Sequence, residues 1–217
     1  MLKAGLIAFM AFTNSAIADE ESVKIGKQTW MAKNLNDASK GGKCYEDKPE
    51  NCEKYGRLYT WDEAMKACPT GWHLPSDKEW QTLVNFASVD GVAGGKLKAK
   101  NGWERGVCAG TDEYGFSALP GGFGVFDGDF YDAGFAGYWW TNLESSDRTK
   151  NKENIDGYQV FLYGWIYYLW AANQESVDRT KGYLMLMLCG KENVSSFFYT
   201  KTGLYSVRCL QNGETHP

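Results

Sequence analysis

The chain has 217 residues, a formal net charge of −4, 15% aromatic residues and 43% hydrophobic residues. This acidic balance argues against nucleic acid as a partner, because nucleic-acid binding requires clustered lysines and arginines that displace counterions. The chain has two histidines, His73 and His216. With so few histidines, we expect neither a histidine-based metal site nor a Ser-His-Asp triad. We expect His73 to be a packed or capping side chain.

The first residues have the order of a secretory signal peptide. Lys3 precedes an apolar run from Ala4 to Phe12, and the small-residue triplet Ala16-Ile17-Ala18 follows it. A membrane anchor is the alternative, but the apolar run is about half of the roughly 20 residues that a bilayer span requires. We therefore expect residues 1–18 to be removed. Residues 19–217 should form a single soluble domain, secreted, periplasmic or held at the cell surface, with no membrane span.

The beginning of this domain predicts a hairpin and then a loop. Val23 to Met31 alternates between polar and apolar residues and carries a Gly26-Lys27 turn, as an opening hairpin would. Residues 32–57 are polar and rich in glycine and lysine. Because they contain Cys44 and Cys52, we expect a loop closed by a local bridge.

Two helices have the clearest local signals. Thr60-Trp61-Asp62-Glu63 and Ser76-Asp77-Lys78-Glu79 both have the spacing of a capping box, and apolar residues follow each box at helical intervals. Pro69 and Gly71 end the first helix. Each helix should bury one face, formed by Trp61, Ala64, Met65 and Cys68 in the first and by Trp80, Leu83, Val84 and Ala87 in the second.

From Gly91 onward the helical periodicity is lost, as expected for short strands joined by tight turns. Phe126-Asp127-Gly128-Asp129-Phe130 is typical of a hairpin turn. Asp127, Asp129 and Asp132 could alternatively be calcium ligands, but the run lacks the loop pattern of a calcium site. We expect a turn and no cofactor here, with calcium as the alternative.

An internal repeat follows. Residues 142–150 recur as residues 173–181 with seven of nine positions identical, and Trp139 and Trp170 precede the two copies at the same offset. We infer a duplicated strand-and-loop unit within an insert at about residues 142–191, although two copies are too few for a solenoid. Further strand material is predicted at residues 158–163, 183–189 and 195–210.

Six cysteines are an even number, which in an exported chain favours three disulfides over metal ligation or catalysis. Spacing of the C-x-x-C kind, typical of zinc sites, does not occur among them. They are Cys44, Cys52, Cys68, Cys108, Cys189 and Cys209.

Several blocks of the sequence stand in a recognisable order: Cys44-Tyr45, residues 51–61, Cys68-Pro69-Thr70-Gly71-Trp72-His73-Leu74-Pro75-Ser76, residues 112–122, Trp139-Trp140 and Ser206-Val207-Arg208-Cys209. In this order they resemble the Fibrobacter succinogenes major paralogous domain family, from about Val23 to Gln211. The stretch between Asn142 and Lys191 is longer than the pattern of this family. The resemblance therefore implies no role for the duplicated insert.

More distantly, the layout is similar to that of C-type lectin-like domains and of formylglycine-generating enzymes. This likeness implies an α+β fold in which two helices of the N-terminal half pack on short, irregular antiparallel strands stapled by disulfides. In that layout the cysteine that ends the first helix pairs with the one on the last strand, which implies Cys68 with Cys209. The eight-residue spacing suggests Cys44 with Cys52, which leaves Cys108 and Cys189.

The motifs that carry activity in those two families are not matched. C-type lectins bind sugar through calcium with Glu-Pro-Asn or Gln-Pro-Asp and Trp-Asn-Asp motifs; here the first is absent and Trp140-Thr141-Asn142 only approximates the second. Formylglycine-generating enzymes use a closely spaced cysteine pair that binds copper, whereas Cys189 and Cys209 are twenty residues apart. The resemblance implies a fold more securely than an activity.

The aromatic content favours a non-catalytic binding module for carbohydrate or another cell-surface component, because flat rings stack on the apolar faces of sugars. The candidate ligand-binding residues are Trp139, Trp140, Trp165, Tyr167 and Trp170. The alternative for each of these rings is that it fills a core that is poor in aliphatic residues. A secreted hydrolase acting on polysaccharide is an alternative, with Asp127, Asp129 and Glu144 as candidates for an acid-base pair, although no spacing singles out two of them. A scaffold whose duplicated loop mediates protein contacts is the third hypothesis.

Overall fold

The structure is a computed structural model that describes residues 21–88, 92–104, 108–125, 127–144, 181–189 and 194–213. The predicted signal peptide, and residues 145–180 of the duplicated insert, lie outside these ranges. Within the described ranges, no helix is long and apolar enough to span a membrane.

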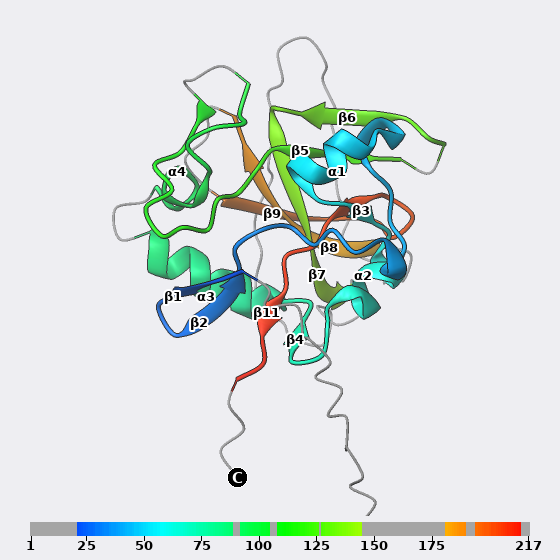
Figure 1. The fold of residues 1–217 in the computed structure, drawn as a ribbon. Coiled ribbons are helices and arrows are strands. Elements are labelled where there is room, and N and C mark those ends of the chain that lie inside the picture. The colour runs from blue at the N-terminus through cyan, green and yellow to red at the C-terminus, as the bar shows by residue number, and fades with distance from the viewer. Residues whose placement is uncertain are drawn as a thin grey trace, which may run out of the picture.

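The opening hairpin is present and belongs to a small sheet. Strands β1 (Ser22–Ile25) and β2 (Gln28–Met31) pair antiparallel on either side of the turn at Gly26. The last strand, β11 (Leu210–Gln211), lies between β2 and β4 (Trp72–His73). Figure 1 shows β11 in red beside the blue hairpin, so this sheet joins the two ends of the domain.

A second, larger sheet is centred on β7 (Ala136–Glu144). On one side of β7, β8 (Lys181–Leu188) and β9 (Val194–Thr200) follow in antiparallel pairing. By contrast, β5 (Gly121–Gly124) and β10 (Tyr205–Ser206) each pair with β7 in parallel. β6 (Phe130–Ala133) pairs with β5, and β3 (Leu58–Tyr59) pairs with β10. The fold is α+β as predicted, but the sheet is mixed rather than purely antiparallel, because β5 and β10 reach β7 through longer connections than a hairpin turn.

Both predicted helices form where their capping boxes begin. α2 (Trp61–Ala67) starts at Thr60, which accepts a hydrogen bond from the backbone of Glu63 while the Glu63 carboxylate accepts one from the backbone of Thr60. α3 (Asp77–Ala87) starts at Ser76 with the same reciprocal pair to Glu79. Each box satisfies two backbone N–H groups that the first turn of a helix leaves without partners.

The sequence did not predict two further short helices. α1 (Pro49–Tyr55) lies in the stretch expected to be a loop, after the 3-10 turns η1 (Ala38–Lys40) and η2 (Tyr45–Asp47). α4 (Ala93–Leu97) contains two glycines and packs beside α3. Two of its carbonyl groups, those of Gly95 and Lys96, accept hydrogen bonds from the backbone N–H groups of Thr111 and Glu113. Helices this short are formed by tertiary contacts rather than by local propensity, so periodicity does not reveal them.

β7 divides the interior into two cores, because successive residues of a strand point to opposite faces. Trp139 faces the core that α3 and α4 cover, together with Met185 and Met187 of β8. Trp140 faces the core that α2 covers, together with Leu184 and Leu186. Figure 1 shows α3 and α4 on one side of β7 and α2 on the other. Both faces of the sheet are therefore buried at this point.

All three expected disulfides are present: Cys44–Cys52, Cys68–Cys209 and Cys108–Cys189. Cys68–Cys209 links the residue that ends α2 to the segment before β11, across 141 residues. Arg57 supports the local bridge, since its guanidinium contacts both sulfur atoms of Cys44–Cys52 and donates to the backbone oxygens of Gly41 and Gly42. The loop is thus closed covalently and by hydrogen bonds.

Arg208, in the last of the sequence blocks that suggested the family, is fully buried. Its Nε and Nη2 donate to Oδ1 of Asn34 at 3.0 and 2.7 Å, and its Nη1 donates to the backbone oxygens of Phe116 and Met31. Burial lowers the pKa of Arg208 to about 9, and the Asp112 carboxylate opposes this shift. The guanidinium stays charged at neutral pH, so these acceptors are needed to replace the water it loses. This block holds the two halves of the chain together.

Candidate functional site

The two predicted ligand-binding residues of β7 lie in the core, which corrects the expectation for them. Trp139 and Trp140 have no exposed surface, because they point to opposite faces of a sheet that is covered on both sides. The indole N–H of Trp139 donates to Oδ1 of Asn34 at 2.8 Å, and that of Trp140 donates to the backbone oxygen of Tyr59 at 2.7 Å. Neither ring faces solvent. Trp165, Tyr167 and Trp170 lie outside the described residues.

The hairpin predicted around Asp127 is present. β5 and β6 pair antiparallel with Phe123 opposite Tyr131, and the backbone N–H of Asp129 donates to Oδ1 of Asp127 across the turn. Of the three candidate calcium ligands, Asp127 and Asp129 are exposed on this turn, and Asp132 lies at the far end of β6. In the described part of the chain, no group of three or more His, Cys, Asp or Glu side chains could hold a metal ion.

Five aromatic side chains form a continuous cluster beside this hairpin. We call it the aromatic platform, and its members are Phe123, Tyr131, Tyr138, Tyr199 and Tyr205. Phe123 is central, with ring centroids 5.5 Å from Tyr131, 5.1 Å from Tyr138, 6.3 Å from Tyr199 and 5.7 Å from Tyr205. The rings come from β5, β6, β7, β9 and β10, so residues distant in the sequence meet here.

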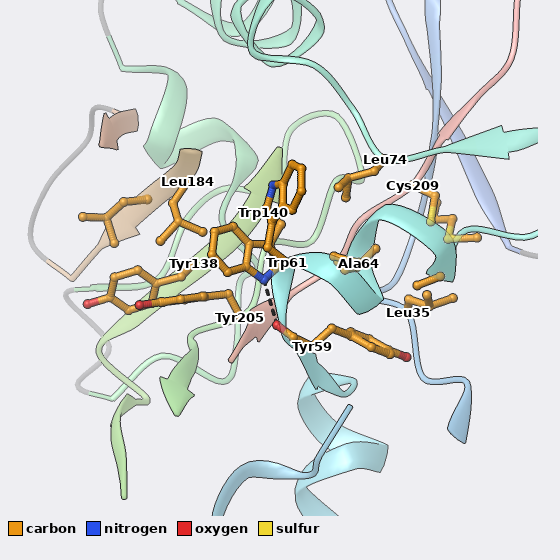
Figure 2. Packing of buried hydrophobic residues seen from close by; sticks show 14 of the residues in the cluster. Leu35, Tyr59, Trp61, Ala64, Leu74, Tyr138, Trp140, Leu184, Tyr205 and Cys209 are labelled. Carbon is orange, nitrogen blue, oxygen red and sulfur yellow. Dashed lines mark hydrogen bonds between the residues drawn. The ribbon is translucent and has the colours of Figure 1, made fainter. Parts of the chain in front are cut away.

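Exposure rises across the platform from its base to its outer edge. Tyr205 and Tyr138 are buried, Phe123 is half-buried, and Tyr131 and Tyr199 are 46% and 38% exposed. Figure 2 shows Tyr138 and Tyr205 next to Trp140 and Leu184, which belong to the core on the α2 side of the sheet. The platform is therefore the surface end of this core, where no helix covers the rings of Tyr131 and Tyr199 completely.

Two carboxylates border the platform and orient its tyrosines. The Tyr138 hydroxyl donates to Oδ2 of Asp132 at 2.6 Å, and the Tyr131 hydroxyl donates to Oδ2 of Asp129 at 3.2 Å. Asp132 reaches Tyr138 with a backbone φ of 66°, a left-handed conformation that aspartate adopts more readily than most residues. The site thus combines flat apolar rings with carboxylate acceptors for the hydroxyl groups of a ligand.

A shallow hollow of about 430 Å³ opens at the end of β6. Its lining is polar and includes Lys54, Tyr55, Trp103, Glu104 and Ala133. The backbone N–H of Glu104 donates to the oxygen of Gly134 at 2.7 Å and joins the two loops that form the hollow. Ligand pockets are mostly apolar with a few polar groups, so this hollow is the weaker candidate.

His73 was expected to be a packed or capping side chain, and it contacts the carboxylate of the α3 capping box. Its Nε2 lies 2.9 Å from Oε1 of Glu79, and its Nδ1 lies 2.7 Å from Oδ1 of Asn212. The Ser76 hydroxyl donates to the other oxygen of the same carboxylate at 2.7 Å. Because Glu79 stands between the hydroxyl and the imidazole, the imidazole cannot take the hydroxyl proton as in a catalytic triad.

Sequence reasoning missed the exposed members of the platform. Tyr131 could have been found from the predicted turn, because pairing outward from Asp127 sets Phe123 opposite Tyr131 on one face of the hairpin. Tyr199 had no such signal. Its place beside Phe123 depends on how β8, β9 and β10 follow β7 in the sheet.

Comparison with known proteins identifies the family but no characterised relative. No curated protein and no solved structure matches this chain. The sequence model of the Fibrobacter succinogenes major domain matches residues 23–211, which include every described strand and helix except the first residue of β1. The chain therefore belongs to the Fibrobacter succinogenes major domain family.

Proposed function

We propose that this protein is a non-catalytic binding module that takes carbohydrate on the aromatic platform. The observation that carries the proposal is the combination of exposed rings at Tyr131 and Tyr199 with the carboxylates of Asp129 and Asp132 at the same surface. Aromatic faces stack on the C–H faces of sugar rings, and carboxylates accept hydrogen bonds from sugar hydroxyls. Rings anchored at their base by Tyr205 and Tyr138 present this surface with little loss of conformational entropy on binding.

We further propose that the domain has a C-type lectin-like layout and acts outside the cytoplasm. Three features support the layout: α2 and α3 in the N-terminal half, the Cys68–Cys209 bridge, and the sheet that joins the two ends of the domain. Three disulfides support an extracytoplasmic location, because disulfides persist in oxidising compartments. The order of residues 1–18 supports export by the secretory route.

The test is retention of the mature domain on insoluble polysaccharides and on a glycan array, for the parent and for Tyr131→Ala and Tyr199→Ala. Each substitution removes one exposed ring, so we expect about tenfold weaker binding for either variant, which corresponds to ~1.4 kcal/mol. Their melting temperatures should change little, since side chains this exposed contribute little to stability.

Phe86→Ala is the matched control. Phe86 is 45% exposed, close to the value for Tyr131, but it lies on α3 and packs against Tyr114 away from the platform. This variant should bind as the parent does. Absence of any retention by the parent, or equal losses for Phe86→Ala and Tyr131→Ala, would refute the proposal.

The hydrolase alternative has its own readout. Release of reducing sugar by the parent, abolished in Asp129→Asn, would favour it over simple binding. The structure offers it less support, because Asp127 and Asp129 are both exposed and the backbone N–H of Asp129 donates to the Asp127 carboxylate within the hairpin turn.

A further inference from the structure

The hydroxyl group of Tyr205 is buried without a hydrogen-bond partner among the described residues. Tyr205 is 1% exposed. Burial raises the pKa of Tyr205, and the neighbouring Tyr199 adds to the rise, so the hydroxyl is neutral and can both donate and accept. Buried polar groups nearly always have partners, so a group without one needs an explanation.

This hydroxyl belongs to the base of the aromatic platform. The Tyr205 ring is stacked on Phe123, with ring planes inclined by 14°, and lies 5.7 Å from the ring of Tyr199 and 5.8 Å from that of Tyr138. Figure 2 shows the Tyr138 and Tyr205 rings side by side at the edge of the core. The unpaired group is therefore carried by a ring that packs directly against Phe123 and Tyr199 of the platform.

The hydroxyl of Tyr205 lies against the turn between β9 and β10. A Cβ atom added to Gly203 would lie 3.0 Å from the Tyr205 hydroxyl oxygen. At Gly203, the turn between β9 and β10 therefore approaches the hydroxyl with its backbone and without a side chain. The Tyr205 ring also lies 5.7 Å from that of Tyr199, the last residue but one of β9, whose side chain is more than one-third exposed. Exposed side chains change rotamer readily, so Tyr199 can turn without repacking of the core.

The other described tyrosines of this region differ from Tyr205. The hydroxyls of Tyr131 and Tyr138 donate to Asp129 and Asp132, and that of Tyr59 exchanges hydrogen bonds with the backbone of Asp37. The indole N–H of Trp80 also lacks a partner among the described residues, but it lies in the opposite core. Tyr205 therefore combines an unpaired polar group with contact to exposed rings.

We propose that the Tyr205 hydroxyl is a specificity-determining group of the platform, which pairs with a hydroxyl of an uncharged sugar unit when Tyr199 turns aside. This inference rests on the proposed function and names its ligand class. The ligand is uncharged because Asp129 and Asp132 border the platform, and their carboxylates repel uronic acids and other anionic sugars. A site that must satisfy a buried polar group rejects ligands that cannot form the bond.

The test is Tyr205→Phe, which removes one oxygen atom. The mature domain with all three disulfides is assayed on a glycan array carrying neutral and uronic-acid oligosaccharides. For the strongest neutral glycan we expect at least a tenfold loss of affinity. The melting temperature should stay equal or rise, because the variant removes an unpaired buried hydroxyl.

Tyr59→Phe is the matched control, since the Tyr59 hydroxyl is buried but paired. This variant should melt at a lower temperature and retain the array profile of the parent. If Tyr205→Phe binds as the parent does while Tyr131→Ala loses binding, the inference is overturned and the proposed function survives. A parent that prefers uronic acids overturns the ligand class, and a parent that binds no glycan overturns both proposals.

Discussion

Two sets of aromatic residues on the same sheet differ in what surrounds them. Trp139 and Trp140 are fully buried, and their indole N–H groups have acceptors in Asn34 and Tyr59. Tyr131 and Tyr199 are substantially exposed, although the rings they contact are as closely packed as those of the core. Ring type does not separate the two sets. The difference is that helices cover both faces of β7, whereas the platform lies where that cover ends.

This comparison explains why aromatic clustering in a sequence is a poor guide to a binding surface. Adjacent tryptophans on one strand point to opposite faces of the sheet. If either face packs against a core, one of the two tryptophans is buried there. Rings that remain exposed after the core is filled are better candidates, since an exposed apolar patch on a stable domain is often functional. Substitutions in the two sets should therefore have separable effects on stability and binding.

The largest expected effect comes from Arg208, which supports Trp139 through their shared acceptor, Oδ1 of Asn34. Arg208→Met removes the cation and leaves that oxygen and the backbone oxygen of Phe116 with fewer donors. We expect the free energy of unfolding to fall by about 3–5 kcal/mol, measured by urea denaturation under non-reducing conditions. Arg208→Lys should not restore it, because an ammonium cannot reproduce the geometry of the guanidinium. A Met variant as stable as the parent would contradict the structural role.

A smaller loss is expected for Trp140→Phe. The change leaves the Tyr59 backbone oxygen without its indole donor and creates a void beside Tyr205, whose ring lies 4.8 Å from that of Trp140. We expect a decrease of about 2 kcal/mol in the free energy of unfolding. Glycan binding by the folded variant should be unchanged. Weaker binding with unchanged stability would assign Trp140 to the ligand site. It would contradict the distinction between buried tryptophans and exposed tyrosines.

The smallest effect is expected at the cap of α3, the helix that covers Trp139. Burial raises the pKa of Glu79, but hydrogen bonds from Ser76 and His73 outweigh it and bring the pKa below the ordinary value of 4.5. At a pH between the folded pKa and 4.5, Glu79 is therefore less protonated in the folded chain than in the unfolded chain. The stabilisation is therefore complete above pH 4.5 and is lost as the pH falls through the folded pKa.

Glu79→Gln should cost less than about 1 kcal/mol at pH 7, because glutamine can keep the capping-box hydrogen bond but loses the negative charge at the start of the helix. The difference from the parent should shrink on acidification below pH 4.5, which urea denaturation at several pH values would measure. Asp62→Asn, in the first turn of α2 but outside its capping box, is the control. If the free energies of unfolding of the parent and of Glu79→Gln differ by the same amount from pH 7 to pH 3, the carboxylate charge does not contribute to stability.

The sequence by itself determined the elements that depend on neighbouring residues. The opening hairpin, the two capped helices and the turn at Asp127 follow from hydrogen bonds and periodicities within a few positions, and all are present. The likeness to the lectin-like layout implied Cys68–Cys209, the eight-residue spacing suggested Cys44–Cys52, and Cys108–Cys189 remained by elimination. The helices α1 and α4 were missed because glycines, a disulfide and tertiary contacts define them.

Only the tertiary structure decided which aromatic rings are exposed. Trp139, Trp140, Tyr131 and Tyr199 all lie on strands. The turn at Asp127 sets Tyr131 opposite Phe123, but the neighbouring residues do not show which of the four rings are buried and which are exposed. Exposure depends on which strands are neighbours in the sheet and which helix covers each face, and these partners are far apart along the chain. The same reason placed the Tyr205 ring against Phe123 and Tyr199, where no local pattern could predict that its hydroxyl would be unpaired.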